Sequence, residues 1–136
     1  MTTTEKVMDL SGRVLIALMF LVGGISKIGA YAATQGYMES AGVPGILLPL
    51  VILFELAGAL AVVLGYGTRM AAAALALFCV ITAFVFHGES GNQAQSILFM
   101  KNLAIAGGFL VIAARGAGDW SLDARRQALQ AAPAVS

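Results

Sequence analysis

The sequence predicts an all-α integral membrane protein: a four-helix bundle with antiparallel neighbours and both termini in the cytoplasm. Hydrophobic residues make up 60% of the 136 residues and charged residues only 11%, whereas a soluble domain carries about 25% charged residues. The charges gather near the ends of the chain and beside turns, and four apolar segments lie between them. Because hydrocarbon offers the backbone no hydrogen-bond partners, segments of this length cross a bilayer as helices.

Turn residues set the boundaries of these helices. The four predicted helices cover residues 13–31, 45–65, 69–87 and 97–114. Gly42-Val43-Pro44-Gly45 precedes the second helix, and Gly65-Tyr66-Gly67-Thr68 separates the second from the third. The latter turn is short enough to make its two helices antiparallel neighbours. Glycine and polar residues in segment 88–92 open the loop before the fourth helix.

Two polar segments flank this domain of residues 13–115. Residues 1–12 form an N-terminal segment, and residues 116–136 form a tail. In the tail, Trp120 and Leu122 followed by Arg125 and Arg126 indicate a short interfacial helix, with a disordered end at 131–136. A frayed polar tail is the alternative interpretation.

Lysine and arginine predict the orientation, because loops rich in these residues stay in the cytoplasm. With four helices, both termini and the loop at Arg69 share one side. That side holds most of the cationic residues: Lys6, Arg13, Arg69, Arg115, Arg125 and Arg126. We therefore expect cytoplasmic termini, with loops at about 31–44 and 88–96 facing outward. Residues 1–32 also resemble a cleavable secretory signal, but Lys27 in front of Ala30-Tyr31-Ala32 argues against cleavage.

The composition excludes several classes of function. A formal net charge of +1 provides no basic patch, so we expect no nucleic-acid partner. The single cysteine, Cys79, cannot form an intrachain disulfide or a redox pair. One histidine cannot hold a haem between two histidines. His87 with Glu55, the one glutamate inside an apolar segment, provides too few good ligands for a metal. We expect no intrinsic cofactor and find no catalytic triad.

Polar residues inside the predicted helices form the candidate site, because such residues are costly in a bilayer and mark functional positions. The candidates are Lys27, Glu55, His87, Lys101 and Asn102. Lys27, Glu55 and Lys101 each lie three or four residues from a glycine or alanine, and small residues line helix contacts in membranes. We therefore expect these three charges to point into the bundle.

The helical rise places these groups at similar depths. Counted from the cytoplasmic helix ends, both lysines lie at about 21 Å, Glu55 at about 15 Å and His87 at about 27 Å. Two ammonium groups would then flank one carboxylate in the outer half, and this excess positive charge would suit an anion or a polar carbonyl group. His87 would exchange protons with the outer water. The residues do not decide which lysine pairs with Glu55.

A purely structural interpretation stands beside this ligand-pocket interpretation. The two lysines would then extend to the outer interface. A Glu55–Lys pair would only fix the register of the helices, and His87 would be an interfacial residue without a task.

Several motifs recur in the order and spacing of a known family. They are Arg13, Gly24-Ile25-Ser26-Lys27, Gly36-Tyr37-Met38, Gly42-Val43-Pro44, Glu55-Leu56-Ala57-Gly58, Gly65 with Thr68-Arg69, His87 and Lys101-Asn102-Leu103. Over about residues 10–115 the chain resembles the DoxX family of small four-helix proteins of the bacterial inner membrane. The resemblance implies a link with thiosulfate:quinone oxidoreductase or with other membrane redox complexes. A branch of the family assists disulfide chemistry, which the lack of a cysteine pair puts in doubt.

Three functions follow as hypotheses. The first is a redox-associated membrane subunit that binds a quinone head group or small anion and needs an electron-carrying partner enzyme. In it, Lys27 and Lys101 hold oxygen atoms, Glu55 sets the charge balance and His87 moves protons. The second is a transporter or channel for a small solute, built as a homo-oligomer. The third is a non-catalytic assembly protein in which the buried charges only hold the bundle together.

Overall fold

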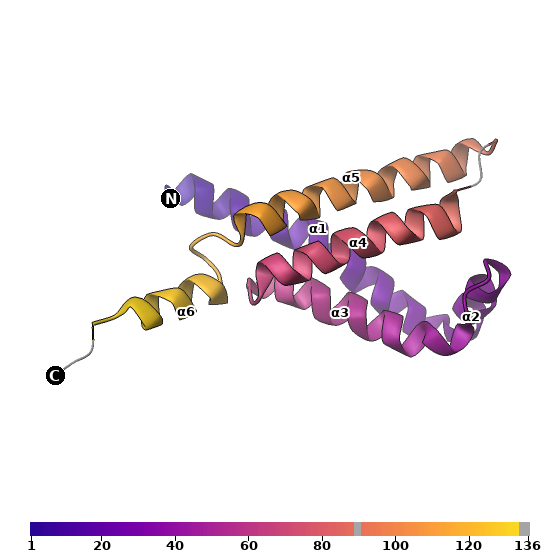
Figure 1. Cartoon of the computed structure of the whole chain (residues 1–136), viewed down its shortest axis with the longest axis horizontal. Helices are drawn as coiled ribbons and strands as arrows, with labels where there is room; N and C mark the ends of the chain where they lie inside the picture. Colours follow the sequence, from indigo (N-terminus) through magenta and orange to yellow (C-terminus); the bar gives the residue numbers. More distant parts are fainter. Residues whose placement is uncertain (89–90, 134–136) are drawn as a thin grey trace.

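The computed structural model describes residues 1–88 and 91–133, and every regular element in these ranges is a helix (Figure 1). The order is α1 (Thr3–Gly29), α2 (Tyr31–Ser40), the 3-10 turn η1 (Gly45–Leu47), α3 (Leu48–Leu64), α4 (Thr68–His87), α5 (Gln93–Arg115) and α6 (Leu122–Ala131). Four segments of the described chain are long and apolar enough to span a membrane: α1, η1 with α3, α4 and α5. The predicted all-α membrane fold with four spanning helices is confirmed.

The helix boundaries differ from the predicted ones where polar residues start a helix. α1 begins at Thr3, well before Arg13, because Thr2 and Glu5 form a reciprocal capping box. α5 begins at Gln93, since the side chain of Asn92 accepts a hydrogen bond from the amide of Ala94. The expected outward loop at 31–44 is largely the helix α2, which has no apolar run to reveal it.

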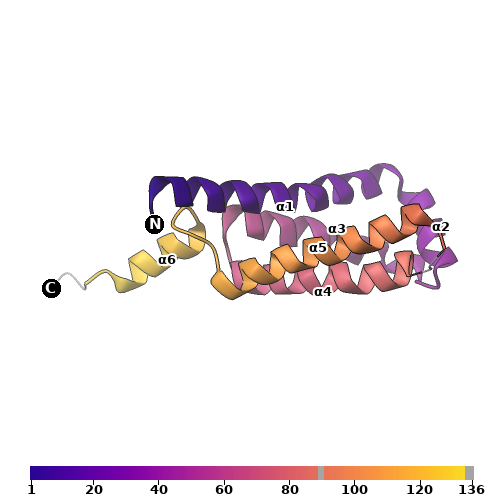
Figure 2. The same ribbon diagram turned by 90° about the horizontal axis from the view of Figure 1, so that it is seen from above.

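The spanning helices pack as two antiparallel pairs. α1 lies against α3, and α4 lies against α5 (Figure 2). Small residues bring the backbones together. Within the first pair, a Cβ atom at Gly24 would lie 2.7 Å from the side chain of Leu56, and between the pairs, one at Gly108 of α5 would lie 2.8 Å from Ile16 of α1. Close approach of this kind stabilises helix contacts where the hydrophobic effect is absent.

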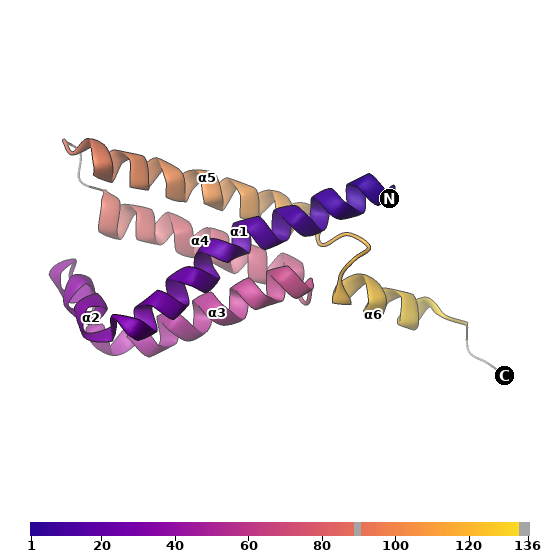
Figure 3. The same ribbon diagram turned by 180° about the vertical axis from the view of Figure 1, so that it is seen from behind.

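The two pairs lie close together at one end of the bundle and diverge at the other. We call these the tail end, where α6 is attached, and the α2 end. Gly65 and Gly67 adopt left-handed backbone conformations in the tight turn that joins α3 to α4 at the tail end. From this turn α3 and α4 diverge toward the α2 end (Figure 1). Seen from behind, α1 crosses from the α5 side at its N-terminus to the α3 side at the α2 end (Figure 3).

A buried arginine fixes the tail end. Arg13 is only 1% exposed. Its guanidinium donates to the backbone oxygens of Val62 and Val63 at 3.0 and 2.9 Å, and to the backbone oxygen of Trp120. Its Nε donates to Asp9 at 3.0 Å. The last carbonyls of a helix have no partner within the helix, so Arg13 caps α3 while binding α1 to the tail.

The tail is docked at its start. Asp123 accepts hydrogen bonds from the amides of Gly67 and Thr68, both at 2.9 Å, and from the Thr68 hydroxyl at 2.7 Å. Its own amide donates to the oxygen of Gly65 at 2.8 Å. Partial burial raises the pKa of Asp123, but the hydrogen bonds from Thr68 and Gly67 outweigh it and leave this pKa below its ordinary value. α6 itself has no buried residue. The predicted disordered end includes residues 134–136, which lie outside the described residues.

Replacing Arg13 tests the cap on α3. Arg13→Met leaves the carbonyls of Val62 and Val63 without their side-chain donor. It also leaves the carboxylate of Asp9 with only the hydrogen bond from the Gly118 amide. We expect the free energy of unfolding to fall by about 3 kcal/mol, equivalent to a fall in Tm of about 10 °C in detergent. Arg125→Met, at an exposed position of α6, is the matched control and should leave Tm unchanged. Equal Tm values for both variants would show that the cap contributes nothing.

The pH dependence of the tail contact tests Asp123. A carboxyl group with a lowered pKa stabilises the fold at neutral pH and loses that contribution as the pH falls through the lowered value, below about pH 4. Hydrogen-exchange protection of the Gly67 and Thr68 amides, corrected for the intrinsic rate, should fall in this range. Asp123→Asn should lower protection already at neutral pH and show a weaker dependence on acid. Full protection in Asp123→Asn would contradict the role of the carboxylate.

Candidate functional site

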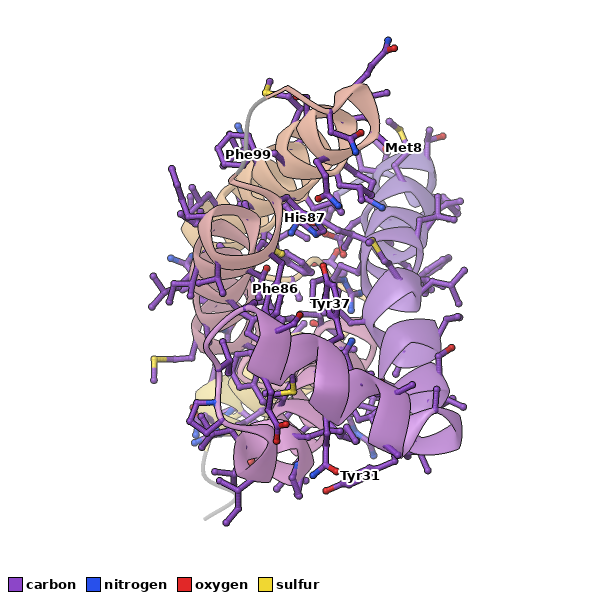
Figure 4. All side chains as sticks on the ribbon, turned by 90° about the vertical axis from the view of Figure 1, so that its right-hand side faces the viewer. Met8, Tyr31, Tyr37, Phe86, His87 and Phe99 are labelled. Carbon is purple, nitrogen blue, oxygen red and sulfur yellow. The ribbon has the colours of Figure 1, made fainter. Side chains whose placement is uncertain are left out.

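A cavity of about 370 Å³ lies between the two helix pairs in the half of the bundle toward the α2 end. Every one of the helices α1 to α5 contributes to its lining. The polar side chains of the lining are Lys27, Thr34, Tyr37, Glu55, Thr82, His87 and Asn102. Figure 4 views the bundle from the α2 end, with Tyr37, Phe86 and His87 toward the centre of the view. The remaining walls are mostly aliphatic, aromatic and sulfur-containing side chains.

An ion pair lies in the wall formed by α1 and α3. The Lys27 ammonium lies 3.0 Å from both carboxylate oxygens of Glu55. Glu55 is 3% exposed, and the Lys27 side chain is 30% exposed. A Cβ atom at Gly23 would lie 3.7 Å from both charged groups, so the backbone of α1 closes over the pair. The pair is neutral as a whole, and an unpaired charge at this depth would be far more costly.

A second set of polar groups joins α4 to α5 in another wall of the cavity. The Asn102 amide donates to the hydroxyl of Thr82 at 3.2 Å. That hydroxyl lies 2.9 and 3.2 Å from the backbone oxygens of Phe78 and Cys79. Its single proton is therefore directed to the helix backbone, and its lone pairs accept from Asn102. One of the two amide protons of Asn102 remains for another acceptor.

His87 lies where the cavity meets the α2 end. Its Nδ1 is 2.7 Å from the side-chain oxygen of Gln95. With the amide assigned this way round, Nδ1 carries the proton, because a carbonyl oxygen only accepts. Neutral His87 then has Nε2 as a hydrogen-bond acceptor, and protonated His87 has it as a donor. Beside it, Tyr37 of α2 stacks on Phe86 with ring centres 5.2 Å apart.

The structure brings together four of the five residues expected from the sequence. Lys27, Glu55, His87 and Asn102 line the cavity. Lys101 does not: it is exposed on α5 and lies outside the lining. The expectation that two lysines flank Glu55 is therefore wrong, and Lys27 is the lysine that pairs with it.

The position of Lys101 has a simple helical reason. The buried face of α5 contains Ala106 and Phe109, and Asn102 shares this face at a spacing of four and seven residues. Lys101 is turned by about 100° from Asn102. The small residues that suggested burial of Lys101 are weak evidence here, because Ala104 on that face is exposed.

Thr82, Cys79, Tyr37 and Phe86 line the cavity although sequence reasoning assigned them no role in a site. Thr82 is the polar residue of an otherwise apolar run, three residues after Cys79, and this spacing could have placed both on one face. Tyr37 and Phe86 gave no such indication, since they lie on elements distant in the sequence. Among the described residues, no three His, Cys, Asp or Glu side chains are grouped in a way that could hold a metal.

The comparisons with known proteins agree with this architecture. A family model described as DoxX matches residues 8–88. The chain belongs to the DoxX family. Lys27, Glu55 and His87 lie within the matched DoxX residues, and Asn102 lies beyond them.

Two relatives of this DoxX-family chain are named inner membrane proteins of Escherichia coli (strain K12). Inner membrane protein YqjF is 47% identical over 123 residues, which is 90% of this chain and 95% of the relative. Inner membrane protein YphA is 34% identical over 129 residues, which is 89% of this chain and 91% of the relative. No solved structure matches the chain. Together with the four apolar helices, these matches place this DoxX-family protein in the bacterial inner membrane.

Removing one partner of the ion pair tests which lysine Glu55 needs. Lys27→Met leaves a buried carboxylate unpaired and should destabilise the protein by about 3 kcal/mol in a micelle unfolding titration. Adding Glu55→Gln should recover most of the lost stability, because the double variant has no charge at this site. Lys101→Met is the control, and its free energy of unfolding should stay within about 0.5 kcal/mol of the wild-type value. A larger effect at Lys101 than at Lys27 would contradict the pairing.

Proposed function

We propose that this DoxX-family protein is a redox-associated membrane subunit that binds a quinone head group in the cavity at the α2 end. One observation carries the proposal: a neutral buried ion pair and the Asn102–Thr82 hydrogen bond face one mostly apolar cavity. A cavity of about 370 Å³ is within the range of small-molecule sites, which are mostly apolar and have few polar groups.

The donors around the cavity suit a ligand that mainly accepts hydrogen bonds. A quinone presents two carbonyl oxygens on an apolar ring. Lys27 has three ammonium protons, of which Glu55 does not occupy all, and Asn102 has one amide proton to spare. These two residues come from α1 and α5, so they can donate hydrogen bonds to oxygens on different edges of one ring.

A small anion is the less well supported ligand. The sequence suggested an excess positive charge from two lysines, but Lys101 is exposed and the charges of Lys27 and Glu55 cancel. A neutral pocket gives an anion little compensation for leaving water. A neutral carbonyl compound loses much less hydration on entering it.

Reduction of a quinone requires two electrons and two protons, and the chain's residues account for proton movement only. The Glu55 carboxylate would hold the Lys27 ammonium in place at the cavity wall. Protonated His87 would donate a proton through Nε2, and neutral His87 would accept one from a quinol. The single cysteine excludes a redox-active disulfide within the chain, and the single histidine excludes a haem held between two of its histidines. The electrons would therefore pass to or from a redox enzyme partner.

Direct binding tests this function. Wild-type protein in lipid nanodiscs is titrated with duroquinone, which has no long chain and no open ring position for addition of a thiol. We expect saturable binding that weakens by about tenfold in Thr82→Val/Asn102→Leu, the loss expected for one or two hydrogen bonds. Lys101→Met, with its exposed site, should bind like the wild type.

Native mass spectrometry of protein extracted gently from its own membrane provides the second readout. A copurified quinone on the wild type, absent from the Thr82→Val/Asn102→Leu variant, would support the proposal. A wild type that neither copurifies with quinone nor binds duroquinone would overturn it, and the ion pair would then have a structural role in an assembly protein.

A further inference from the structure

A second cavity, also of about 370 Å³, lies between α3 and α4. It is lined only by apolar side chains: Leu47, Leu50, Val51 and Phe54 from one side, and Ala74, Leu77, Phe78 and Ile81 from α4. We call it the α3–α4 groove. Its outer rim faces the surrounding medium, since Leu50 is 64% and Leu77 is 61% exposed. In a bilayer this rim faces lipid chains.

The groove exists because α3 and α4 are held together at one end only. A Cβ atom at Gly58 would lie 3.1 Å from the side chain of Leu75, so the two helices approach closely there. From this contact they diverge toward the α2 end (Figure 1). The groove therefore opens at the same depth as the polar cavity.

The groove and the polar cavity share a wall. Val51, Phe78 and Ile81 line both. The ring of Phe78 lies between Phe54, with ring centres 5.3 Å apart, and Phe20, with ring centres 6.3 Å apart. Phe54 lines the groove and Phe20 lines the polar cavity. These shared residues separate the two spaces, and rotation of their side chains is fast compared with movement of helices.

We propose that the α3–α4 groove is a lateral portal, through which a lipid-soluble amphiphile enters from the bilayer and in which its apolar chain remains. The head group would occupy the polar cavity, and the chain would pass the wall at Phe78 and leave between Leu50 and Leu77. The inference rests on the proposed function and narrows it to compounds with a long alkyl or isoprenoid chain. A water-soluble ligand would gain nothing from an apolar space that adjoins its site.

The groove contributes to selection more than to affinity. Lipid chains are as apolar as the groove, so moving a chain from one to the other gains little from the hydrophobic effect. What the groove determines is whether a head group that carries a chain can reach Lys27 and Asn102 at all. Blocking it should therefore exclude chain-bearing compounds and leave a chainless head group unaffected.

The test compares two probes and two matched variants in nanodiscs. Duroquinone is the chainless probe, and decylubiquinone carries a ten-carbon chain. Ala74→Phe fills the groove, and the control Ala73→Phe adds the same ring at an exposed neighbouring position. We expect Ala74→Phe to weaken decylubiquinone binding by about tenfold or more while duroquinone binds as to the wild type. Ala73→Phe should change neither.

The outcomes separate the two proposals. If neither probe binds the wild type, the proposed function fails. If both bind the wild type and Ala74→Phe weakens neither, or weakens both equally, the portal is overturned while quinone binding stands. Should Ala74→Phe not fold, the same comparison is made with Leu50→Trp in the groove and Leu53→Trp as its control, since these positions are 64% and 65% exposed.

Discussion

The guanidinium of Arg13 is the interaction on which the arrangement of this protein depends. It satisfies the last carbonyls of α3, holds Asp9 on its own helix and binds the backbone at Trp120. A charged group 1% exposed is tolerable only with this many partners. Together with the Lys27–Glu55 pair, it joins α1 to α3 at two depths. Two such polar ties, with Ala17 and Ala59 buried among the core residues, fix the register of α1 against α3.

The candidate site is a consequence of where the helices stop touching. The Arg13 contacts and the close approach of Gly108 to Ile16 hold the helices together toward the tail end. The two helix pairs separate toward the α2 end and leave a space that side chains do not fill. Polar groups face this space because they have partners there: Glu55 has Lys27, and Asn102 has Thr82. No buried side-chain nitrogen or oxygen within the described residues lacks a hydrogen bond. The site is therefore polar without being strained, and it can exchange some hydrogen bonds for those of a ligand.

The sequence predicted what depends on local composition and missed what depends on distant contacts. Four apolar runs were sufficient to predict the four spanning helices, and the position of Glu55 within one of them predicted its burial. Lys101 was misplaced because small residues mark a close contact but do not say which neighbour makes it. α2 and the docking of Asp123 on Thr68 had no pattern of their own. Arg13 was noticed as a motif, yet the backbone oxygens that it binds on α3 and in the tail lie about fifty and more than a hundred residues away, where no periodicity connects them.

The docking of Asp123 has a consequence for how the chain is assembled. The amides of Gly67 and Thr68 begin α4, yet their acceptor is made only after the whole of α5 has followed. During synthesis, four spanning helices can therefore all be inserted while the turn between α3 and α4 still lacks its partner. The turn gains its acceptor only when the tail has been made. A chain interrupted after α5 would therefore lack the hydrogen bonds to Asp123 at a turn that was synthesised long before the interruption.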